Sequence, residues 1–158
     1  MKTDISLEEE KRYEQLQLIA LDYARVGESK ELEKMIKAVI NVNLTTHKED
    51  SLLILASYNG NYETCKMLIS YKARLNQRNQ RGQTPLEGVC FKGYLNIVKL
   101  LVENKVEVNS KAIMYASIFG NIDIVKYLKS KKTNVSLGVR ILEVFSAVVS
   151  YFKVKAQQ

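Results

Sequence analysis

The side chains that could carry catalysis or hold a metal are few in this chain. Its one histidine, His47, has no second histidine, cysteine or carboxylate near it at a metal-ligand spacing. Cys65 and Cys90 fall at small or apolar positions of helical patterns, so we expect buried, unreactive thiols. Glu87 is the one acidic residue placed on an inner helix face, and it lacks a carboxylate partner for acid–base work. Without a phosphate-binding glycine loop, a nucleophile elbow or a metalloprotease motif, the sequence predicts no enzyme.

The composition is that of one globular domain with a hydrophobic core. The chain has 158 residues, of which 46% are hydrophobic and 26% charged. One proline and seven glycines leave little room for a turn-rich all-β fold. The first residues lack the apolar stretch of a signal peptide, and two cysteines cannot form a disulfide framework. We therefore expect a soluble cytoplasmic protein.

A repeat runs through the chain. Four glycines are separated by 33, 33 and 27 residues, and each of the first three is followed 16 residues later by an asparagine. A short apolar segment precedes each glycine, and apolar residues at helical spacing follow it. The pattern predicts pairs of short helices, with the glycine ending the first helix in the left-handed conformation. The repeated positions are Gly27, Gly60, Gly93 and Gly120, and Asn43, Asn76 and Asn109.

The third copy resembles the ankyrin repeat. Residues 82–86 match the family's G-x-T-P-L opening, residues 93–101 match its second helix, and residues 108–109 match its closing V-N. Thr84 suits the N-cap position, with Pro85 at the first helical position. The resemblance covers roughly residues 18–136. It implies an all-α ankyrin-repeat solenoid of about four helix-pair repeats with helical N- and C-terminal caps, and a non-catalytic module that binds proteins through its concave face.

This resemblance divides residues 1–158, taken as one ankyrin-repeat domain, into repeats and caps. Two projecting hairpins are expected around residues 45–50 and 77–83. The third is expected to be missing, because only Ser110 separates Asn109 from Lys111. The segments are an N-terminal helical extension 1–17, repeats 18–43, 44–76, 77–109 and 110–136, and a C-terminal capping helix and tail 137–158. Within that last segment, self-association or membrane-surface binding through residues 137–152 is the alternative to capping, and the stretch is too short to span a bilayer.

The resemblance places a binding surface at the two residues before each glycine. The first members form a row of arginine, aromatic and aliphatic side chains, the kinds of side chain expected to anchor a partner. The alternative is that these side chains only cover the inner helices. The candidate binding residues are Arg25, Tyr58, Asn59, Phe91, Lys92, Ile118 and Phe119, and Val26 occupies the remaining position.

Similarity to small single-domain bacterial ankyrin proteins, some of them associated with catalase, implies an alternative function: haem binding and haem delivery to a catalase. Tyr58 would ligate the haem iron as the phenolate, which the positive charge of Arg25 would favour. Apolar side chains of the row would contact the porphyrin, and Lys92 would meet the propionates. No other metal site is expected.

Positive charge is concentrated in the C-terminal part. Residues 1–91 carry 13 basic and 13 acidic side chains, whereas residues 92–158 carry 11 basic and 4 acidic ones. Such a region attracts an acidic protein or an anionic ligand, and simple solubility is the alternative. Nucleic acid is not favoured, because aromatic residues do not alternate with the basic ones on a recognised nucleic-acid-binding fold.

Overall fold

The computed structural model describes residues 6–131, and over these residues it contains eight α-helices and no β-strand. The predicted all-α arrangement of helix pairs is confirmed. The capping helix expected at 137–152 lies outside the described residues. The helices are α1 (Leu7–Val26), α2 (Ser29–Ala38), α3 (Leu52–Tyr58), α4 (Tyr62–Ser70), α5 (Pro85–Lys92), α6 (Leu95–Glu103), α7 (Ser110–Ile118) and α8 (Ile122–Lys131).

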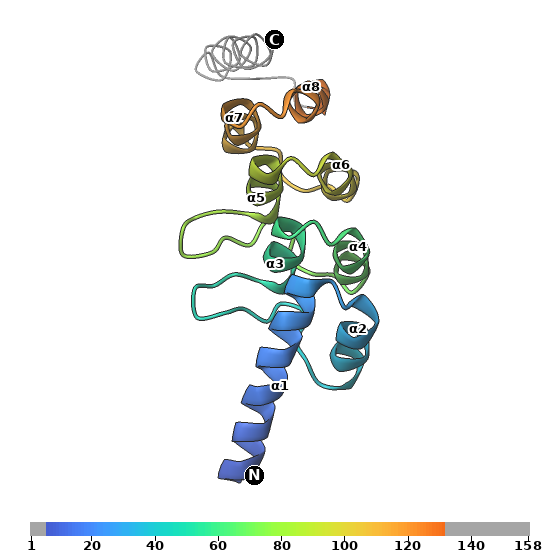
Figure 1. Cartoon of the computed structure of the whole chain (residues 1–158), viewed down its shortest axis with the longest axis vertical. Coiled ribbons are helices and arrows are strands. Elements are labelled where there is room, and N and C mark those ends of the chain that lie inside the picture. Colours follow the sequence, from blue (N-terminus) through green and yellow to red (C-terminus); the bar gives the residue numbers. More distant parts are fainter. Residues whose placement is uncertain (1–5, 132–158) are drawn as a thin grey trace, which may run out of the picture. The chain divides into compact units, whose positions relative to one another are not determined.

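The chain forms two compact units, unit 1 (Met1–Arg74) and unit 2 (Leu75–Gln158). In unit 1, α1 packs against α3 and α2 against α4, and in unit 2, α5 packs against α7 and α6 against α8 (Figure 1). We call the first helix of each pair inner and the second outer. In each unit the long turn before an inner helix projects away from the outer helices (Figure 1). None of the helices described between residues 6 and 131 could span a bilayer.

The inner helices begin at side-chain caps. Thr84 Oγ1 accepts a hydrogen bond from the backbone N–H of Glu87 (3.3 Å), and the Glu87 carboxylate accepts one from the N–H of Thr84 (3.4 Å). With Pro85 at the first position, this capping box confirms the predicted start of α5. Ser51 caps α3 and Asn109 caps α7 by accepting from the N–H groups of Ile54 and Ala112, without the reciprocal carboxylate bond. The first four N–H groups of a helix have no partner within the helix, and in each case the capping side chain accepts a hydrogen bond from one of them.

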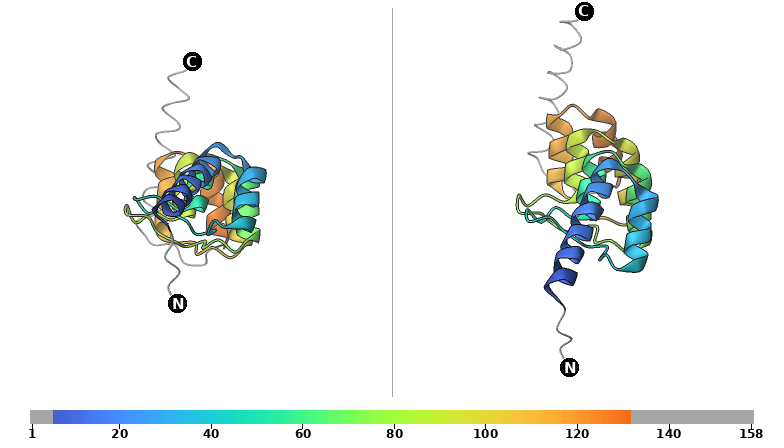
Figure 2. Two further views of the ribbon diagram at one scale, coloured as in Figure 1. Left: turned by 90° about the horizontal axis from the view of Figure 1, so that it is seen from below. Right: turned by 60° about the horizontal axis from the view of Figure 1, so that its bottom comes forward.

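The N-terminal half of α1 extends beyond the helix pair of unit 1 (Figures 1 and 2). A capping box formed by Ser6 and Glu9 starts this helix, and three acidic residues occupy its first turn, where the helix dipole favours negative charge. The helix then continues without a break to Val26. The expected extension and the first inner helix are thus one element.

The apolar positions of the repeat form the cores. Leu32 and Leu68 are fully buried in unit 1, and Leu101 and Leu128 take the equivalent place in unit 2. The apolar residue that follows directly, such as Ile69, is only half-buried. Each outer helix therefore packs a fully buried leucine into its unit, joined in α4 by Cys65 and in α6 by Ile97 and Val98.

The periodic asparagines link successive repeats within each unit. Asn43 Oδ1 accepts a hydrogen bond from the N–H of Arg74 (2.8 Å), and Asn76 Oδ1 accepts one from the N–H of Glu107 (3.0 Å). Each bond spans 31 residues. Asn109, the third member of the series, caps α7 instead, because no hairpin separates it from that helix.

A small polar cluster joins the outer helices of unit 1. Glu33 on α2 accepts hydrogen bonds from Lys37 Nζ (2.9 Å) and from the hydroxyl of Tyr71, which follows α4 (2.8 Å). The bond from Lys37 and then the bond from Tyr71 hold the pKa of Glu33 below its ordinary value. The ionised carboxylate therefore favours the docked arrangement of α2 and α4.

Candidate binding surface

The candidate binding residues lie at the C-terminal ends of the inner helices, where each helix ends at a glycine. Gly27 and Gly93 both have φ of +89°, and they close α1 and α5 with bonds from their N–H groups to Tyr23 O and Val89 O. This left-handed conformation is the one that the repeat predicted, and glycine adopts it without steric cost. The last residues of each helix are consequently held in a defined position next to the turn.

An asparagine from the next repeat secures each of these two ends. Asn61 Nδ2 donates to Ala24 O (3.0 Å) and Arg25 O (2.8 Å) in unit 1. Asn121 Nδ2 donates to Cys90 O (2.8 Å) and Phe91 O (3.4 Å) in unit 2. A Cβ at Gly93 would lie 2.7 Å from Asn121 Oδ1, so the glycine also makes room for this amide. The amide satisfies carbonyl groups that the helix itself leaves without a partner.

Unit 2 holds four of the candidate residues and brings two of them into contact. The Phe91 and Phe119 rings contact edge to face, with centroids 4.2 Å apart and planes at 71°. Ile118 and Phe119 are each 51% exposed, and Lys92 is exposed beside the half-buried Phe91. The ends of α5 and α7 therefore form an apolar surface in which one aromatic ring fixes the other.

Unit 1 presents polar groups at the equivalent positions. The Arg25 guanidinium pairs with the Asp22 carboxylate one turn earlier on α1. Tyr58 is 38% exposed, and Asn59 Nδ2 donates back to Leu55 O at the end of α3 (2.8 Å). Arg25 lies on the wall of a hollow of about 500 Å³ between α1 and the first projecting turn, which also contains His47.

Arg25 and Tyr58 are the two residues of the haem scheme that lie in unit 1. The charge of Arg25 is already balanced by Asp22, so it has less effect on the phenol of Tyr58. The hollow that Arg25 lines also contains the carboxylates of Glu14 and Asp22, which would repel haem propionates. Tyr58 is not among its lining residues. The geometry thus gives no support to iron ligation at Tyr58.

The two projecting turns have the same internal structure. We call residues 45–50 finger 1 and residues 77–83 finger 2. In finger 1 the Thr46 side chain accepts from the N–H groups of Lys48 and Asp50, and in finger 2 the Asn79 side chain accepts from those of Arg81 and Gln83. An isolated bridge, Thr45 to Ser51, closes finger 1. Both segments predicted as hairpins project as turns without β-strands, and α7 begins at Ser110 without such a finger, as predicted.

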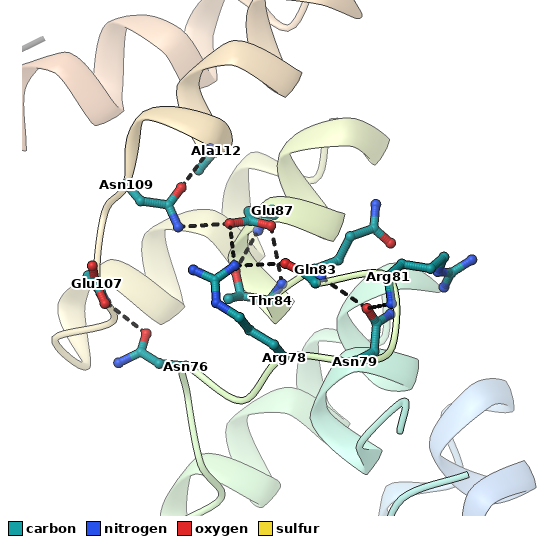
Figure 3. Close-up of polar contacts among 11 residues, drawn as sticks. Asn76, Arg78, Asn79, Arg81, Gln83, Thr84, Glu87, Glu107, Asn109 and Ala112 are labelled. Atoms are coloured by element: carbon teal, nitrogen blue, oxygen red, sulfur yellow. Dashed lines mark hydrogen bonds and ion pairs between the residues drawn. The ribbon is translucent and has the colours of Figure 1, made fainter. Parts of the chain in front are cut away.

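A buried carboxylate anchors finger 2. Glu87 is 1% exposed and accepts hydrogen bonds from Asn109 Nδ2 (2.8 Å) and Arg78 Nη1 (3.4 Å), which converge on it in Figure 3. Arg78 also donates to Gly82 O (2.7 Å) and so crosses the base of the finger. A buried charge requires partners of this kind. The arrangement ties finger 2 and the start of α7 to α5, a structural role for the residue that sequence reasoning left without one.

The two thiols are buried and unreactive in this geometry. Cys65 and Cys90 are fully buried and free, as expected. Burial raises the pKa of Cys65 to about 12. The pKa of Cys90 is also raised, mainly by burial and to a smaller extent by the negative charge of Glu87. Across residues 6–131, histidine, cysteine and carboxylate side chains form no cluster of three that could hold a metal ion.

Comparison with known proteins identifies the family. A family model described as ankyrin repeats (3 copies) matches residues 21–112 and 53–140. The chain belongs to the ankyrin-repeat family. In solved structures it is similar to the human ASB11 ankyrin repeat domain, with a TM-score of 0.67 and 26% identity, over 73% of this chain and 54% of that one.

Curated relatives agree with this family. Protein phosphatase 1 regulatory subunit 27 of Mus musculus is 34% identical over 87 residues, covering 54% of this chain and 56% of the relative. The ankyrin repeat protein PA3287 of Pseudomonas aeruginosa is 46% identical over 46 residues, covering 29% of this chain and 27% of the relative. The chain thus spans about half, or less, of the length of these relatives. Together the comparisons support a protein-interaction module.

Three residues of the surface region were missed by sequence reasoning. Asn61 and Asn121 follow the repeat glycines directly, and the recurring Gly-Asn pair at 60–61 and 120–121 was the available signal. Ile122, at the start of α8, is 42% exposed close in sequence to Phe119. Nothing in its helical spacing distinguishes it from a core residue, so only the structure reveals it.

Proposed function

We propose that this chain is a non-catalytic protein-interaction module whose partner contacts the ends of the inner helices. The observation that carries the proposal is the exposed pair Ile118 and Phe119, with Phe119 fixed against Phe91. Burying the exposed half of each of these two side chains would contribute about 1 kcal/mol per residue. Contiguous apolar groups on a surface are characteristic of an interaction site. In unit 1, the equivalent helix ends offer the polar groups of Arg25, Tyr58 and Asn59 for contact with a partner.

Two further observations support a protein partner inside the cell. The mouse relative is named as a regulatory subunit of a phosphatase, which supports a protein rather than a small molecule as partner. Cys65 and Cys90 are buried free thiols, which suits a reducing compartment such as the cytoplasm.

Site-specific photocrosslinking tests the proposal. A photoreactive benzoylphenylalanine in place of Ile118 should form discrete covalent adducts with a protein in cells that express the chain. The matched control replaces Val39, which is 52% exposed at the end of α2 and so offers the same access away from the proposed surface. Adducts at position 118 that disappear when excess unlabelled protein competes would support the proposal. Equal adducts at both positions, or none at position 118, would contradict it.

The alternative, haem binding and delivery to a catalase by a small bacterial ankyrin protein, is a separate prediction of the family resemblance. Because Arg25 pairs with Asp22, we expect hemin to give the same weak absorption change with the native protein and with Tyr58→Ala. A saturable Soret shift that Tyr58→Ala abolishes would establish haem ligation and make catalase the first partner to test.

A further inference from the structure

The two units differ in charge. The described residues of unit 1, 6–74, carry 10 basic and 11 acidic side chains, whereas those of unit 2, 75–131, carry 9 basic and 4 acidic ones. One of the four acidic residues, Glu87, is buried beneath Arg78 and Asn109. The solvent-accessible part of unit 2 is therefore strongly positive, and unit 1 is close to neutral.

The apolar surface of unit 2 lies within this positive region. We call it the Phe119 surface and define it by Phe91, Ile118, Phe119 and Ile122. Ile122 also lines a hollow of about 470 Å³ between the starts of α6 and α8, together with Lys126 and Asp123. An exposed lysine, Lys92, directly follows Phe91 in the sequence. Apolar groups and positive charges thus adjoin one another, with Asp123 as the acidic residue of the hollow.

The equivalent positions of unit 1 lack this combination. Val26 precedes Gly27 as Phe119 precedes Gly120, and it is 68% exposed. The residue before it is Arg25, whose charge is balanced by Asp22. Exposure of an apolar side chain before the repeat glycine is therefore common to both units, but the joined aromatic pair and the positive surroundings belong to unit 2.

We propose that the Phe119 surface binds an acidic protein segment that inserts aliphatic or aromatic anchors between Phe119 and the hollow beside Ile122. This inference rests on the proposed function and adds the chemistry of the partner. Carboxylates of the segment would lie near Lys92 and Lys126, and the surrounding positive charge would accelerate the encounter. A single-stranded nucleic acid would match the charge, but Phe91 is half-buried against Phe119 and Ile118 and Ile122 are aliphatic, so the surface lacks a run of exposed rings on which successive bases could stack.

Fluorescence anisotropy with a labelled peptide of alternating Glu and Leu and one central Phe tests the inference on the full chain. We expect saturable binding that weakens as salt is added, since screening removes the charge contribution. Replacing Ile118 and Phe119 together by Ser should weaken binding about tenfold or more. The matched control, Val26→Ser, changes the equivalent exposed residue of unit 1 and should change binding less than about twofold.

Lys92→Glu gives an independent test on an exposed side chain at the end of α5. It should weaken binding several-fold at low salt and reduce the salt dependence. Equal binding of a peptide with Lys in place of Glu, or an equal effect of Val26→Ser, would overturn the inference. The inference would also be overturned if the acidic peptide failed to bind and the chain instead bound oligothymidylate or anionic vesicles through the same surface, so that the Ser substitutions abolished that binding. If crosslinks form at position 118 but the acidic peptide does not bind, the proposed function stands and the acidic partner is rejected.

Discussion

Gly93→Ala should destabilise the protein through two separable effects. At φ of +89° an alanine occupies the left-handed region, which costs about 1 kcal/mol. Its Cβ would lie 2.7 Å from Asn121 Oδ1, so the amide must move away and give up its bonds to Cys90 O and Phe91 O. One short and one long hydrogen bond together contribute about 1 to 1.5 kcal/mol. The free energy of unfolding should therefore fall by about 2 to 2.5 kcal/mol.

A double-mutant cycle separates the two effects. In an Asn121→Ala background the amide is already absent, so Gly93→Ala should cost only the backbone term of about 1 kcal/mol. Gly82→Ala is the matched control, because Gly82 also has positive φ (+69°) but a Cβ there would meet no atom within 4 Å. It too should cost about 1 kcal/mol.

Urea unfolding followed by far-ultraviolet circular dichroism measures these differences through the midpoint, provided that the dependence on urea is unchanged among the variants. An unchanged slope matters because repeat proteins do not always unfold in one step. Equal losses for Gly82→Ala and Gly93→Ala would refute the reasoning, as would additive effects of the Gly93 and Asn121 substitutions. Either result would mean that the asparagine amide does not hold the end of α5.

Two further predictions concern titrating groups. Burial raises the pKa of Cys65 to about 12 and raises the pKa of Cys90 as well. Ellman's reagent at mildly alkaline pH should therefore modify neither thiol of the folded chain, whereas both thiols should react in urea. Fast modification before unfolding would contradict their burial. The pKa of Glu33 lies below its ordinary value of 4.5 because Lys37 and then Tyr71 donate hydrogen bonds, so its contribution to stability is complete above the unfolded-state pKa and is lost as the pH falls through the folded-state value. Tyr71→Phe should raise the pKa of Glu33 measured by NMR titration and reduce the loss of stability in acid, and an unchanged pKa would show that the hydroxyl has no part in it.

Much of the fold was predictable because its determinants are local. The cap formed by Thr84 and Pro85, the left-handed glycines at 27 and 93, and the apolar residues at helical spacing act within a few positions of the chain. The spacing of Asn109 and Lys111 likewise predicted a repeat without a hairpin, and α7 begins where that spacing requires. For the same reason the general position of the candidate surface, just before each glycine, followed from the repeat.

The pairing of side chains at the surface was not predictable in this way, because it depends on elements that only folding brings together. Asn121 reaches carbonyl groups 30 and 31 residues earlier, and Asn109 reaches Glu87 across 22 residues. Helical spacing says nothing about such partners.

The sequence by itself therefore determined the helices, their ends, the fingers and the concentration of charge in the C-terminal part, since each follows from local conformational preference or from composition. Only the tertiary structure decided that Phe119 lies against Phe91 and that Asn121 reaches the end of α5. Those contacts depend on how neighbouring helices pack and on which rotamers the packing allows. They give unit 2 its joined aromatic surface, whereas the Arg25–Asp22 pair of unit 1 is local, three residues apart on α1.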